Sequence, residues 1–352
     1  MREVRIHASR AYTVHIEAGL LDRVGALLRP ITRAQKACIV SGERVDRLYG
    51  DRLERSLLAT GFSVLRWRHP SGEQHKNLET YGRLLNFLAE SGLGRGDVLV
   101  SLGGGVTGDL TGFAAATYQR GMDYVQVPTS LLAMVDSSVG GKTAVDLTAG
   151  KNLCGCFWQP LAVFCDPALL ATLPEKELRG GGAEVIKYAI LRDEVLFDKL
   201  LREPSAATRD EVIQRCVSMK RDLVEEDEFD RGSRRLLNLG HSFGHAVELC
   251  SDYSVSHGYA VAIGLAGIAR ACAGMYVCSE ETAERIQEIL RAFSLPTETD
   301  IPRVELLEAM LRDKKRQGDD LPLILPEAIG RCRVQRVPLG ELDEWLRLGG
   351  FA

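Results

Sequence analysis

The sequence predicts an α/β domain over residues 1–171, built on a doubly wound parallel sheet, followed by an all-α domain over residues 172–352. A chain of 352 residues is too long for one ordinary hydrophobic core, so two domains are expected. In the first half, apolar runs of strand type alternate with segments of helical spacing, which predicts parallel strands joined by crossover helices. After about Leu173 nearly every periodic segment is helical, which places the boundary near residue 171.

Strands of the first domain are expected where short apolar runs end at glycine or polar residues, and helices where the spacing is amphipathic. The strand-type runs are KACIVSG (36–42), FSVLRWRH (62–69), DVLVSLGGG (97–105) and the start of DYVQVPTSLLAMV (123–135). Helical spacing is found in 45–60 and in 78–92, which ends with a glycine. The second domain has helical segments at 174–201, 209–230, 258–276 and 279–295, and strand signals persist only near 321–337.

Composition and charge indicate a globular protein and argue against several other classes of protein. Hydrophobic residues make up 45% and charged residues 26%, as in ordinary globular proteins, and the net charge of −4 argues against a nucleic-acid partner. The start, MREVRIHASRAYTVHIEAGL, lacks the apolar stretch of a signal peptide. The uncharged run 253–269 indicates a buried helix rather than a membrane span. The nine cysteines lack paired spacing and are expected to be reduced thiols of a cytoplasmic protein, with Cys154 and Cys156 in core packing.

A glycine-rich loop follows the third strand-type run. Gly103, Gly105 and Gly108 satisfy G-x-G-x-x-G between an expected strand and an expected helix. Glycines let the backbone approach phosphates, and a helix N-terminus offers free N–H groups, so the loop predicts a Rossmann-like dinucleotide site. The alternative is a tight turn that needs positive φ. Asp123 precedes the next strand instead of ending it, so the ribose contact is not assigned to it.

The segment DSSVGGKTAVD has some likeness to a phosphate loop. A Walker A motif needs glycine six places before the lysine, where this chain has Asp136, so the match fails. Lys142 remains a candidate phosphate ligand as a point charge, and the alternative is a surface lysine.

Three histidines lie close together in the second domain. His241 and His245 are one helical turn apart, and His257 follows. A catalytic zinc site commonly uses two histidines and a carboxylate, for which Glu184 in an apolar helix is the candidate. The spacing allows His241 with His245, or His241 with His257 and His245 left for the substrate. The alternatives are satisfied core histidines and an ordinary ion pair of Glu184 with Lys187.

Basic residues and an asparagine precede these histidines: Lys220, Arg234, Arg235 and Asn238. Arg234, Asn238, His241 and His245 follow three- or four-residue steps, so one helix face is expected to carry them. A cationic, amide-bearing face beside a metal suits an anionic substrate.

From about residue 70 to 330 the chain resembles the 3-dehydroquinate synthase family. The matching segments are GGGVTGDLTGFAAATYQRG, QVPTSLLAMVDSSVGGKTAVD, GKNLCGCFWQP, TLPEKELRGGGAEVIKY, RRLLNLGHSFGHAVE, HGYAVAIGL and DKK. The resemblance implies a dehydroquinate synthase-like fold with the active site between two domains. It also implies a homodimer, bound NAD and a divalent metal, zinc or cobalt.

The resemblance carries site residues onto this chain. It implies Glu184, His241 and His257 as metal ligands, and leaves His245 for the substrate. The implied substrate set is Asp136, Lys142, Asn152, Lys187, Lys220, Arg234, Asn238, His245 and either Lys314 or Lys315, and Arg120 is implied to reach the neighbouring subunit's phosphate site. The implied NAD set is Ser71, Gly72, Glu73, Lys76, Gly104, Gly105, Val106, Thr107, Gly108, Asp109, Thr129, Ser130, Lys142, Lys151 and Thr172.

The implied reaction converts 3-deoxy-D-arabino-heptulosonate 7-phosphate, a sugar phosphate, to 3-dehydroquinate and phosphate. NAD oxidises the C5 alcohol, phosphate leaves by elimination, NADH returns the hydride, and an intramolecular aldol step closes the ring. Lys220 and Arg234 would hold the carboxylate, whereas Lys142, Asn152, His245 and a DKK lysine would hold the phosphate.

Three positions depart from the family pattern, and rival functions follow from related scaffolds. Gly42 stands where many members have an aspartate near the adenine end of NAD, so that contact is not assigned. Ser130 and Ser242 replace usual threonines and keep the hydroxyl. The rivals are other sugar phosphate cyclases, including one making aminodehydroquinate, a metal-dependent alcohol or glycerol dehydrogenase, and a non-catalytic NAD- or metal-binding protein. The set Lys220, Arg234 and Asn238 favours a substrate with a carboxylate.

Overall fold

The computed structural model describes residues 1–312 and 318–352 and divides the chain into two compact units. The sheet unit comprises Met1–Leu173 and Arg209–Phe229, and the helical unit comprises Pro174–Thr208 and Asp230–Ala352. The sequence analysis assigned residues 209–229 to the second domain, and the structure places them in the first. Helix α8 (Asp210–Glu226) packs along strand β1 (Arg2–Ile6), and the Glu225 carboxylate accepts a 2.7 Å hydrogen bond from the backbone N–H of His7.

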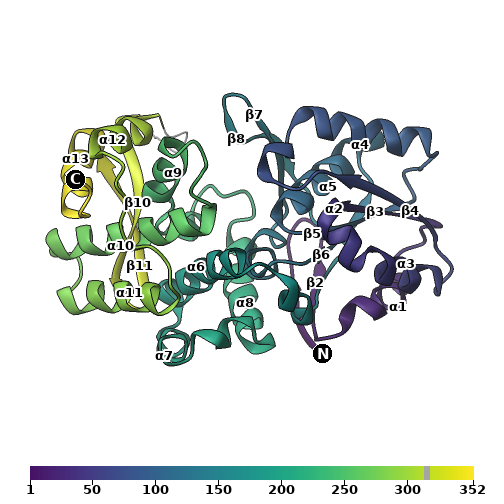
Figure 1. The fold of residues 1–352 in the computed structure, drawn as a ribbon, viewed down its shortest axis with the longest axis horizontal. Helices are drawn as coiled ribbons and strands as arrows, with labels where there is room; N and C mark the ends of the chain where they lie inside the picture. Colours follow the sequence, from purple (N-terminus) through teal and green to yellow (C-terminus); the bar gives the residue numbers. More distant parts are fainter. Residues whose placement is uncertain (313–317) are drawn as a thin grey trace. The chain divides into compact units, whose positions relative to one another are not determined.

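The sheet unit contains a seven-stranded sheet, in which six strands form one parallel array (Figure 1). The order is β1-β2-β9-β6-β5-β3-β4, with β1 antiparallel to β2 and the other pairs parallel. The strands that follow β1 are β2 (Tyr12–Ile16), β3 (Lys36–Gly42), β4 (Ser63–His69), β5 (Val98–Gly103), β6 (Asp123–Pro128) and β9 (Ala162–Cys165). Strand β5 is buried along its whole length, as its mostly apolar sequence predicts.

Helices cover this sheet on both faces. On one face, Leu84 and Leu88 of α4 (Leu78–Glu90) and Leu110 of α5 (Gly105–Thr117) join Leu99 of β5 in one buried cluster. Asn77 caps α4 by accepting a hydrogen bond from the backbone N–H of Thr80. The β3–β4 crossover is helical over Glu43–Leu58, as α2 (Glu43–Val45), the π-helical segment η3 (Asp46–Gly50) and α3 (Asp51–Leu58). The smaller helical segments are η1 (Leu20–Arg23), α1 (Val24–Leu28), η2 (Arg29–Ile31), η4 (Glu73–His75), η5 (Tyr118–Arg120), η6 (Ala133–Ser137) and η7 (Pro167–Thr172).

A hairpin that the sequence analysis did not predict carries two candidate substrate residues. Strands β7 (Lys142–Leu147) and β8 (Gly150–Phe157) pair antiparallel, so Lys142 begins one strand and Asn152 lies in the other. Cys154 and Cys156 of β8 pack against the α4–α5 core cluster, in agreement with the interpretation of these cysteines as core packing.

The helical unit confirms the expected helical second domain, with one addition. Its helices are α6 (Glu175–Arg192), α7 (Glu194–Arg202), η8 (Pro204–Thr208), η9 (Ser233–Asn238), α9 (His241–Cys250), α10 (His257–Gly274), α11 (Glu280–Ala292), α12 (Arg303–Leu311), η10 (Leu339–Glu341) and α13 (Leu342–Leu348). Strands β10 (Asp320–Ala328) and β11 (Arg331–Pro338) form a hairpin that packs on α10 (Figure 1). The apolar residues of β10 are buried, which explains why strand signals persist there in the sequence.

Candidate active site

The described candidate residues fall into a helical-unit group and a sheet-unit group. Glu184, His241 and His257 come from three different helices, α6, α9 and α10, and their ligand atoms lie within 4.8 Å of one another. The Nε2 atoms of His241 and His257 lie 3.5 Å and 3.3 Å from Oε1 of Glu184. Two imidazole nitrogens and one carboxylate oxygen that converge in this way form a donor set suited to a divalent transition metal.

Glycines let these three helices approach closely. A Cβ atom on Gly258, beside His257, would collide with the backbone of Gly180, which lies one turn before Glu184 on α6. A Cβ atom on Gly240 would lie 2.9 Å from the backbone nitrogen of Leu265 in α10, and the φ of Gly240 is +75°. The donors therefore meet because the backbones of α6, α9 and α10 come closer than side chains would allow.

The carboxylate at the centre of this group is deeply buried and ionised. Oε2 of Glu184 forms an ion pair with the Lys187 ammonium, and both side chains are 1% exposed. Burial alone would raise the pKa of the Glu184 carboxyl, but Lys187, His241 and His257 outweigh that effect and hold the pKa well below its usual range. Glu184 therefore presents a negative charge to the two imidazoles.

Each imidazole is fixed by a contact through its other nitrogen. Nδ1 of His241 donates to the carbonyl of Leu239 at 3.0 Å, and burial lowers the pKa of His241, so Nε2 carries a lone pair. Nδ1 of His257 lies 3.1 Å from Oε2 of the buried Glu248. Burial would lower the pKa of His257, but the hydrogen bonds and charges of Glu184 and Glu248 raise it to about 10. The sequence analysis missed Glu248, whose only signal was its place three residues after His245.

The structure also bears on the two histidine pairings that the spacing left open. It brings His241 and His257 together with Glu184, whereas His245 shares a second potential donor group with Glu248 and His257. The His245 ring lies edge-on to that of His241, with centroids 5.4 Å apart. His245 is thus adjacent to the Glu184 group but not part of it.

The expected single helix face for Arg234, Asn238, His241 and His245 is wrong. Arg234 and Asn238 lie in the 3-10 segment η9, whereas the histidines lie in α9. The left-handed conformation of Gly240 separates the two segments, so the three- and four-residue spacing does not continue across it. Arg234 is nevertheless buried, and the Asn238 amide donates to the carbonyl of Arg235 at 3.1 Å.

In the sheet unit, the glycine loop has the predicted strand–loop–helix context. β5 ends at Gly103, Gly104 is the N-cap residue, and α5 begins at Gly105. Thr107, in the first turn of α5, hydrogen-bonds Nε2 of His69 at 3.1 Å. The loop therefore presents the opening turn of a helix of thirteen residues at the carboxyl edge of the sheet.

Lys76 joins residues of the implied NAD and substrate sets. Its buried ammonium lies 2.8 Å from Glu73, 3.3 Å from Asp109 and 3.7 Å from Asp146, and it donates to Oδ1 of Asn152 at 2.9 Å. Burial would lower the pKa of Lys76, but the three carboxylates raise it above its ordinary value. Burial raises the pKa of Asp109 to about 6, although Lys76 opposes that rise.

A second buried lysine orders another part of the sheet unit. Nζ of Lys220 on α8 lies 3.1 Å from the Asp136 carboxylate and donates to the Asp136 carbonyl at 2.7 Å. The structure thus brings together two residues of the implied substrate set, 84 positions apart in the chain. Arg120 is exposed at the end of η5 with a φ of +66°.

The other implied residues are less tightly grouped. Thr129 is buried and its N–H donates to the carbonyl of Gly103 at 3.0 Å, whereas Thr172 hydrogen-bonds the hydroxyl of Tyr49. Ser71 and Gly72 precede η4, and Val106 and Gly108 lie in α5. Ser130 follows β6, and Lys151 lies in β8. Lys314 and Lys315 lie outside the described residues.

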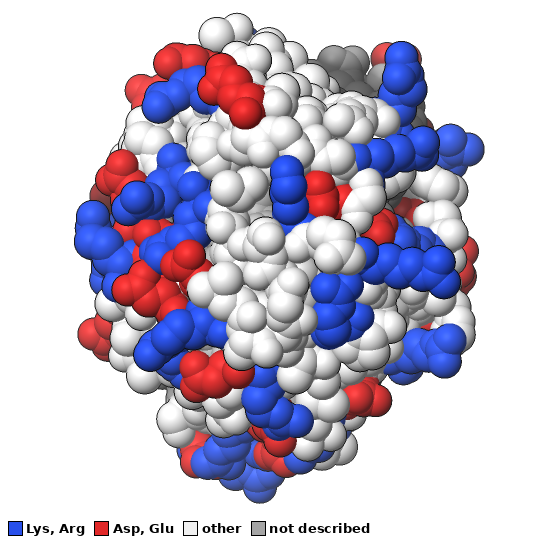
Figure 2. All heavy atoms as spheres, turned by 90° about the vertical axis from the view of Figure 1, so that its right-hand side faces the viewer, with Lys and Arg blue, Asp and Glu red and all other residues white. Residues whose placement is uncertain are grey.

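The surface charge and the apolar character of the helices bear on the kind of partner expected. On the face drawn in Figure 2, basic and acidic side chains are interspersed and form no extended field of one sign. Within residues 1–312 and 318–352, none of the helices combines the length and apolar character needed to cross a membrane.

Comparison with known proteins gives a consistent picture. Family models described as 3-dehydroquinate synthase N-terminal and C-terminal match residues 67–180 and 181–316. A 3-dehydroquinate synthase from Enterococcus faecalis is 41% identical over 350 residues, which cover 97% of this chain and 98% of that protein. A 2-epi-5-epi-valiolone synthase from Streptomyces hygroscopicus with NAD+ and Zn2+ bound has a TM-score of 0.89 at 27% identity, covering 99% of both chains. A 2-deoxy-scyllo-inosose synthase with carbaglucose-6-phosphate, NAD+ and Co2+ has a TM-score of 0.86 at 25% identity, covering 98% of this chain and 99% of that one.

Proposed function

Since this chain belongs to the 3-dehydroquinate synthase family, we propose that it converts 3-deoxy-D-arabino-heptulosonate 7-phosphate to 3-dehydroquinate and phosphate, the second step of the shikimate pathway. The observation that carries this proposal is the 41% identity to a 3-dehydroquinate synthase over nearly the whole of both chains. The enzyme would be a carbon–oxygen lyase that oxidises its substrate transiently and regenerates NAD in each turnover.

Glu184, His241 and His257 would hold a divalent metal, zinc or cobalt. The fit is supported by the short distances among their donor atoms, by the ionised state of Glu184 and by the Nδ1–H tautomer of His241. Once bound, the metal would polarise the alcohol oxygen that is oxidised. Glu248 would act as a positioning residue, because it fixes the His257 ring through Nδ1.

The glycine loop and the segment around Lys76 would hold NAD. The first turn of α5 offers backbone N–H groups to the pyrophosphate, and Gly104 and Gly105 allow close approach. Bound NAD would accept and return the hydride. Lys76 orders Glu73 and Asp109 around itself, and this supports the proposed position of the implied NAD set.

Lysine, arginine and amide side chains would bind the two anionic groups of the substrate. Lys220 and Arg234 would hold the carboxylate, and the planar fork of arginine suits that group. Lys142, Asn152 and His245 would hold the phosphate, with either Lys314 or Lys315. Asp136 would position the Lys220 ammonium, as their 3.1 Å ion pair supports.

We further propose that the protein is a cytoplasmic homodimer. Arg120 would serve the phosphate site of the neighbouring subunit, and its exposed position on η5 is compatible with that role. Sedimentation of wild type and Arg120→Ala, combined with activity assays of both, would test the assignment. A fully active monomer would contradict it.

Phosphate release tests the proposed function directly. The purified protein would receive 3-deoxy-D-arabino-heptulosonate 7-phosphate, catalytic NAD and zinc or cobalt, with absorbance at 340 nm followed in parallel. We expect stoichiometric phosphate and 3-dehydroquinate without net NADH, and much slower release with Lys142→Ala. Steady NADH formation from a simple polyol would indicate a dehydrogenase instead. Absence of phosphate release with either metal would favour a different cyclase substrate.

A further inference from the structure

The carboxyl end of β3 lies beside the strand that carries the glycine loop. In the parallel register, Ser41 of β3 is opposite Leu102 of β5, and Gly42 is opposite His69 of β4. In dinucleotide-binding sheets, the end of the strand next to the glycine-loop strand faces the adenosine ribose. A carboxylate there binds the 2′-hydroxyl of NAD, whereas an arginine accommodates the 2′-phosphate of NADP. The residues around Gly42 therefore bear on which dinucleotide the protein accepts.

The last residue of β3 offers no side chain to the ribose. A Cβ atom on Gly42 would find its nearest neighbours at ordinary contact distance, 3.6 Å from Cε1 of His69 and 3.7 Å from Oγ of Ser71. His69 is buried, and burial lowers its pKa, while Nδ1 donates to the Pro70 carbonyl at 2.8 Å. The side chains nearest this position are therefore uncharged, and space remains for a larger group.

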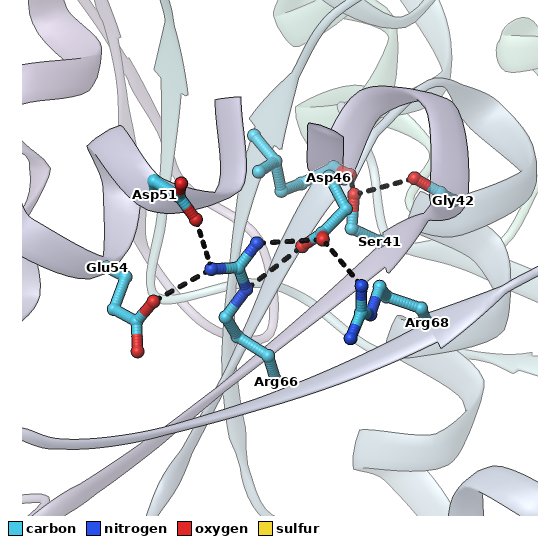
Figure 3. Close-up of polar contacts among 8 residues, drawn as sticks. Ser41, Gly42, Asp46, Asp51, Glu54, Arg66 and Arg68 are labelled. Carbon is cyan, nitrogen blue, oxygen red and sulfur yellow. Dashed lines mark hydrogen bonds and ion pairs between the residues drawn. The ribbon is translucent and has the colours of Figure 1, made fainter. Parts of the chain in front are cut away.

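The buried carboxylate close to this strand end is already bound by an arginine. Asp46 is 3% exposed and accepts hydrogen bonds from Nε of Arg66 at 3.1 Å and from Nη2 at 2.7 Å (Figure 3). Nη1 of Arg66 binds Asp51 and Glu54 as well. Asp46 is therefore unsuited to accept a hydrogen bond from a ribose hydroxyl, because both of its oxygens face the Arg66 fork.

Two other arginines remain accessible. Arg68 lies opposite Ser41 and its side chain is 60% exposed. Its Nη1 forms an ion pair with Asp46 at 3.6 Å, which is longer than a hydrogen bond. Figure 3 shows Arg68 on the side of the cluster toward Gly42, whereas Asp51 and Glu54 lie on the other side of Arg66. Arg44 is exposed on α2, two residues after Gly42. The acidic residue that intervenes, Glu43, is exposed to solvent.

We propose that this strand end accepts a 2′-phosphate, so that the protein binds NADP(H) as well as NAD(H), with Arg68 and Arg44 as the phosphate ligands. Arginine guanidinium groups match phosphate with paired hydrogen bonds. The inference rests on the proposed function, because it assumes that the glycine loop holds a dinucleotide.

Separate titrations with NADH and NADPH test the inference. The zinc-loaded full chain, freed of bound nucleotide, would be titrated while the nicotinamide fluorescence is followed. We expect the two dissociation constants to agree within about tenfold. Binding of NADH with NADPH more than about a hundredfold weaker would overturn this inference and leave the proposed function intact. Failure to bind either nucleotide would overturn both.

Three substitutions make the test specific to these residues. Gly42→Asp would restore a carboxylate and is expected to weaken NADPH binding about tenfold or more while preserving NADH binding. Arg68→Ser is expected to weaken NADPH binding about tenfold and NADH binding less than about twofold. The control Arg33→Ser removes an exposed arginine just before the opposite end of β3 and should change neither constant.

Two outcomes with these variants would contradict the assignment. Unchanged NADPH binding in both Gly42→Asp and Arg68→Ser would show that the 2′-phosphate lies elsewhere. If the wild type rejects NADPH and Glu43→Ala admits it, then Glu43 selects NAD and the proposal is wrong.

Discussion

Two buried charge clusters, one in each unit, differ in what balances their carboxylates. In the sheet unit, the Lys76 ammonium lies within 3.7 Å of Glu73, Asp109 and Asp146, so the central cation is a side chain of the protein. In the helical unit, the carboxylate of Glu184 is central, and two imidazole nitrogens converge on it within 3.5 Å. In the first cluster the oxygen lone pairs point at the Lys76 ammonium. In the second, two imidazole nitrogens converge with a carboxylate oxygen, which is the donor set that proteins use for divalent transition metals.

The buried charges around Lys76 mainly order the chain, whereas the buried charge of Glu184 serves as a metal ligand in the proposed site. Lys76 holds η4, α5 and the β7–β8 hairpin in place around the proposed NAD site. Glu184 instead contacts the imidazoles of His241 and His257 and the Lys187 ammonium. The low pKa of its carboxyl keeps it available as an anionic ligand. Substitutions in the first cluster should therefore change stability and NAD binding but not metal binding, and substitutions in the second should change metal binding and turnover.

The largest expected effect is that of Glu184→Gln on turnover. A metal contributes several kcal/mol to transition-state stabilisation, so phosphate release should fall by about 10³-fold. The assay is phosphate release at saturating zinc. Glu177→Gln, the same substitution at an exposed position of α6, is the control and should retain full activity. Equal activity of the two variants would contradict the role of Glu184.

Lys76→Met should lower the free energy of unfolding by about 3 kcal/mol, because removing one partner of a buried ion pair leaves the other charges uncompensated. Urea unfolding monitored by circular dichroism measures this change. The comparison is Arg52→Met, which removes the exposed ion pair with Asp22 and should cost at most about 1 kcal/mol. Similar costs for both substitutions would show that the Lys76 cluster is not a buried network in solution.

Glu248→Gln should weaken zinc binding about 10- to 100-fold while the fold is retained, because partners that orient metal-binding histidines have effects of that size. Competition with a chromophoric chelator measures the affinity, and circular dichroism checks the fold. An affinity equal to that of the wild type would indicate that Nδ1 of His257 does not depend on Glu248 for its orientation.

A pH dependence of the free energy of unfolding is expected to arise from Asp109. Its pKa is raised from 3.8 to about 6 in the folded protein, so the unfolded chain releases this proton at lower pH than the folded chain. The contribution of Asp109 to stability should therefore decrease as the pH rises from about 4 to about 6 and remain constant above that. Asp109→Asn should remove this part of the pH dependence in urea unfolding. An identical pH profile of wild type and variant would disprove the raised pKa.

Sequence reasoning succeeded where local patterns determine structure. The apolar run before Gly103 and the glycines after it predicted both β5 and the start of α5. The histidine spacing identified the residues that approach Glu184 but did not choose between His245 and His257. That choice depends on the close contact of Gly180 with Gly258, which joins helices 78 positions apart and leaves no periodic signal.

The sequence analysis failed where tertiary contacts override local signals. Helix α8 was assigned to the second domain by its position in the chain, yet its contacts with β1 and the Lys220–Asp136 pair place it in the sheet unit. The steps from Asn238 to His241 have helical spacing, but Gly240 adopts a left-handed conformation that ends the pattern. The β7–β8 hairpin has a weak local signal, because β8 contains Gly150 and Gly155 and is only partly buried.

Zinc binding by three proteins tests the difference between the two clusters most directly. Metal content and chelator competition would be measured for wild type, Glu184→Gln and Lys76→Met. We predict one tightly bound zinc per chain in the wild type, its loss in Glu184→Gln, and its retention in Lys76→Met. Wild-type protein without a tight zinc site, or zinc that is lost with Lys76→Met but retained in Glu184→Gln, would contradict the assignment of the metal to Glu184, His241 and His257.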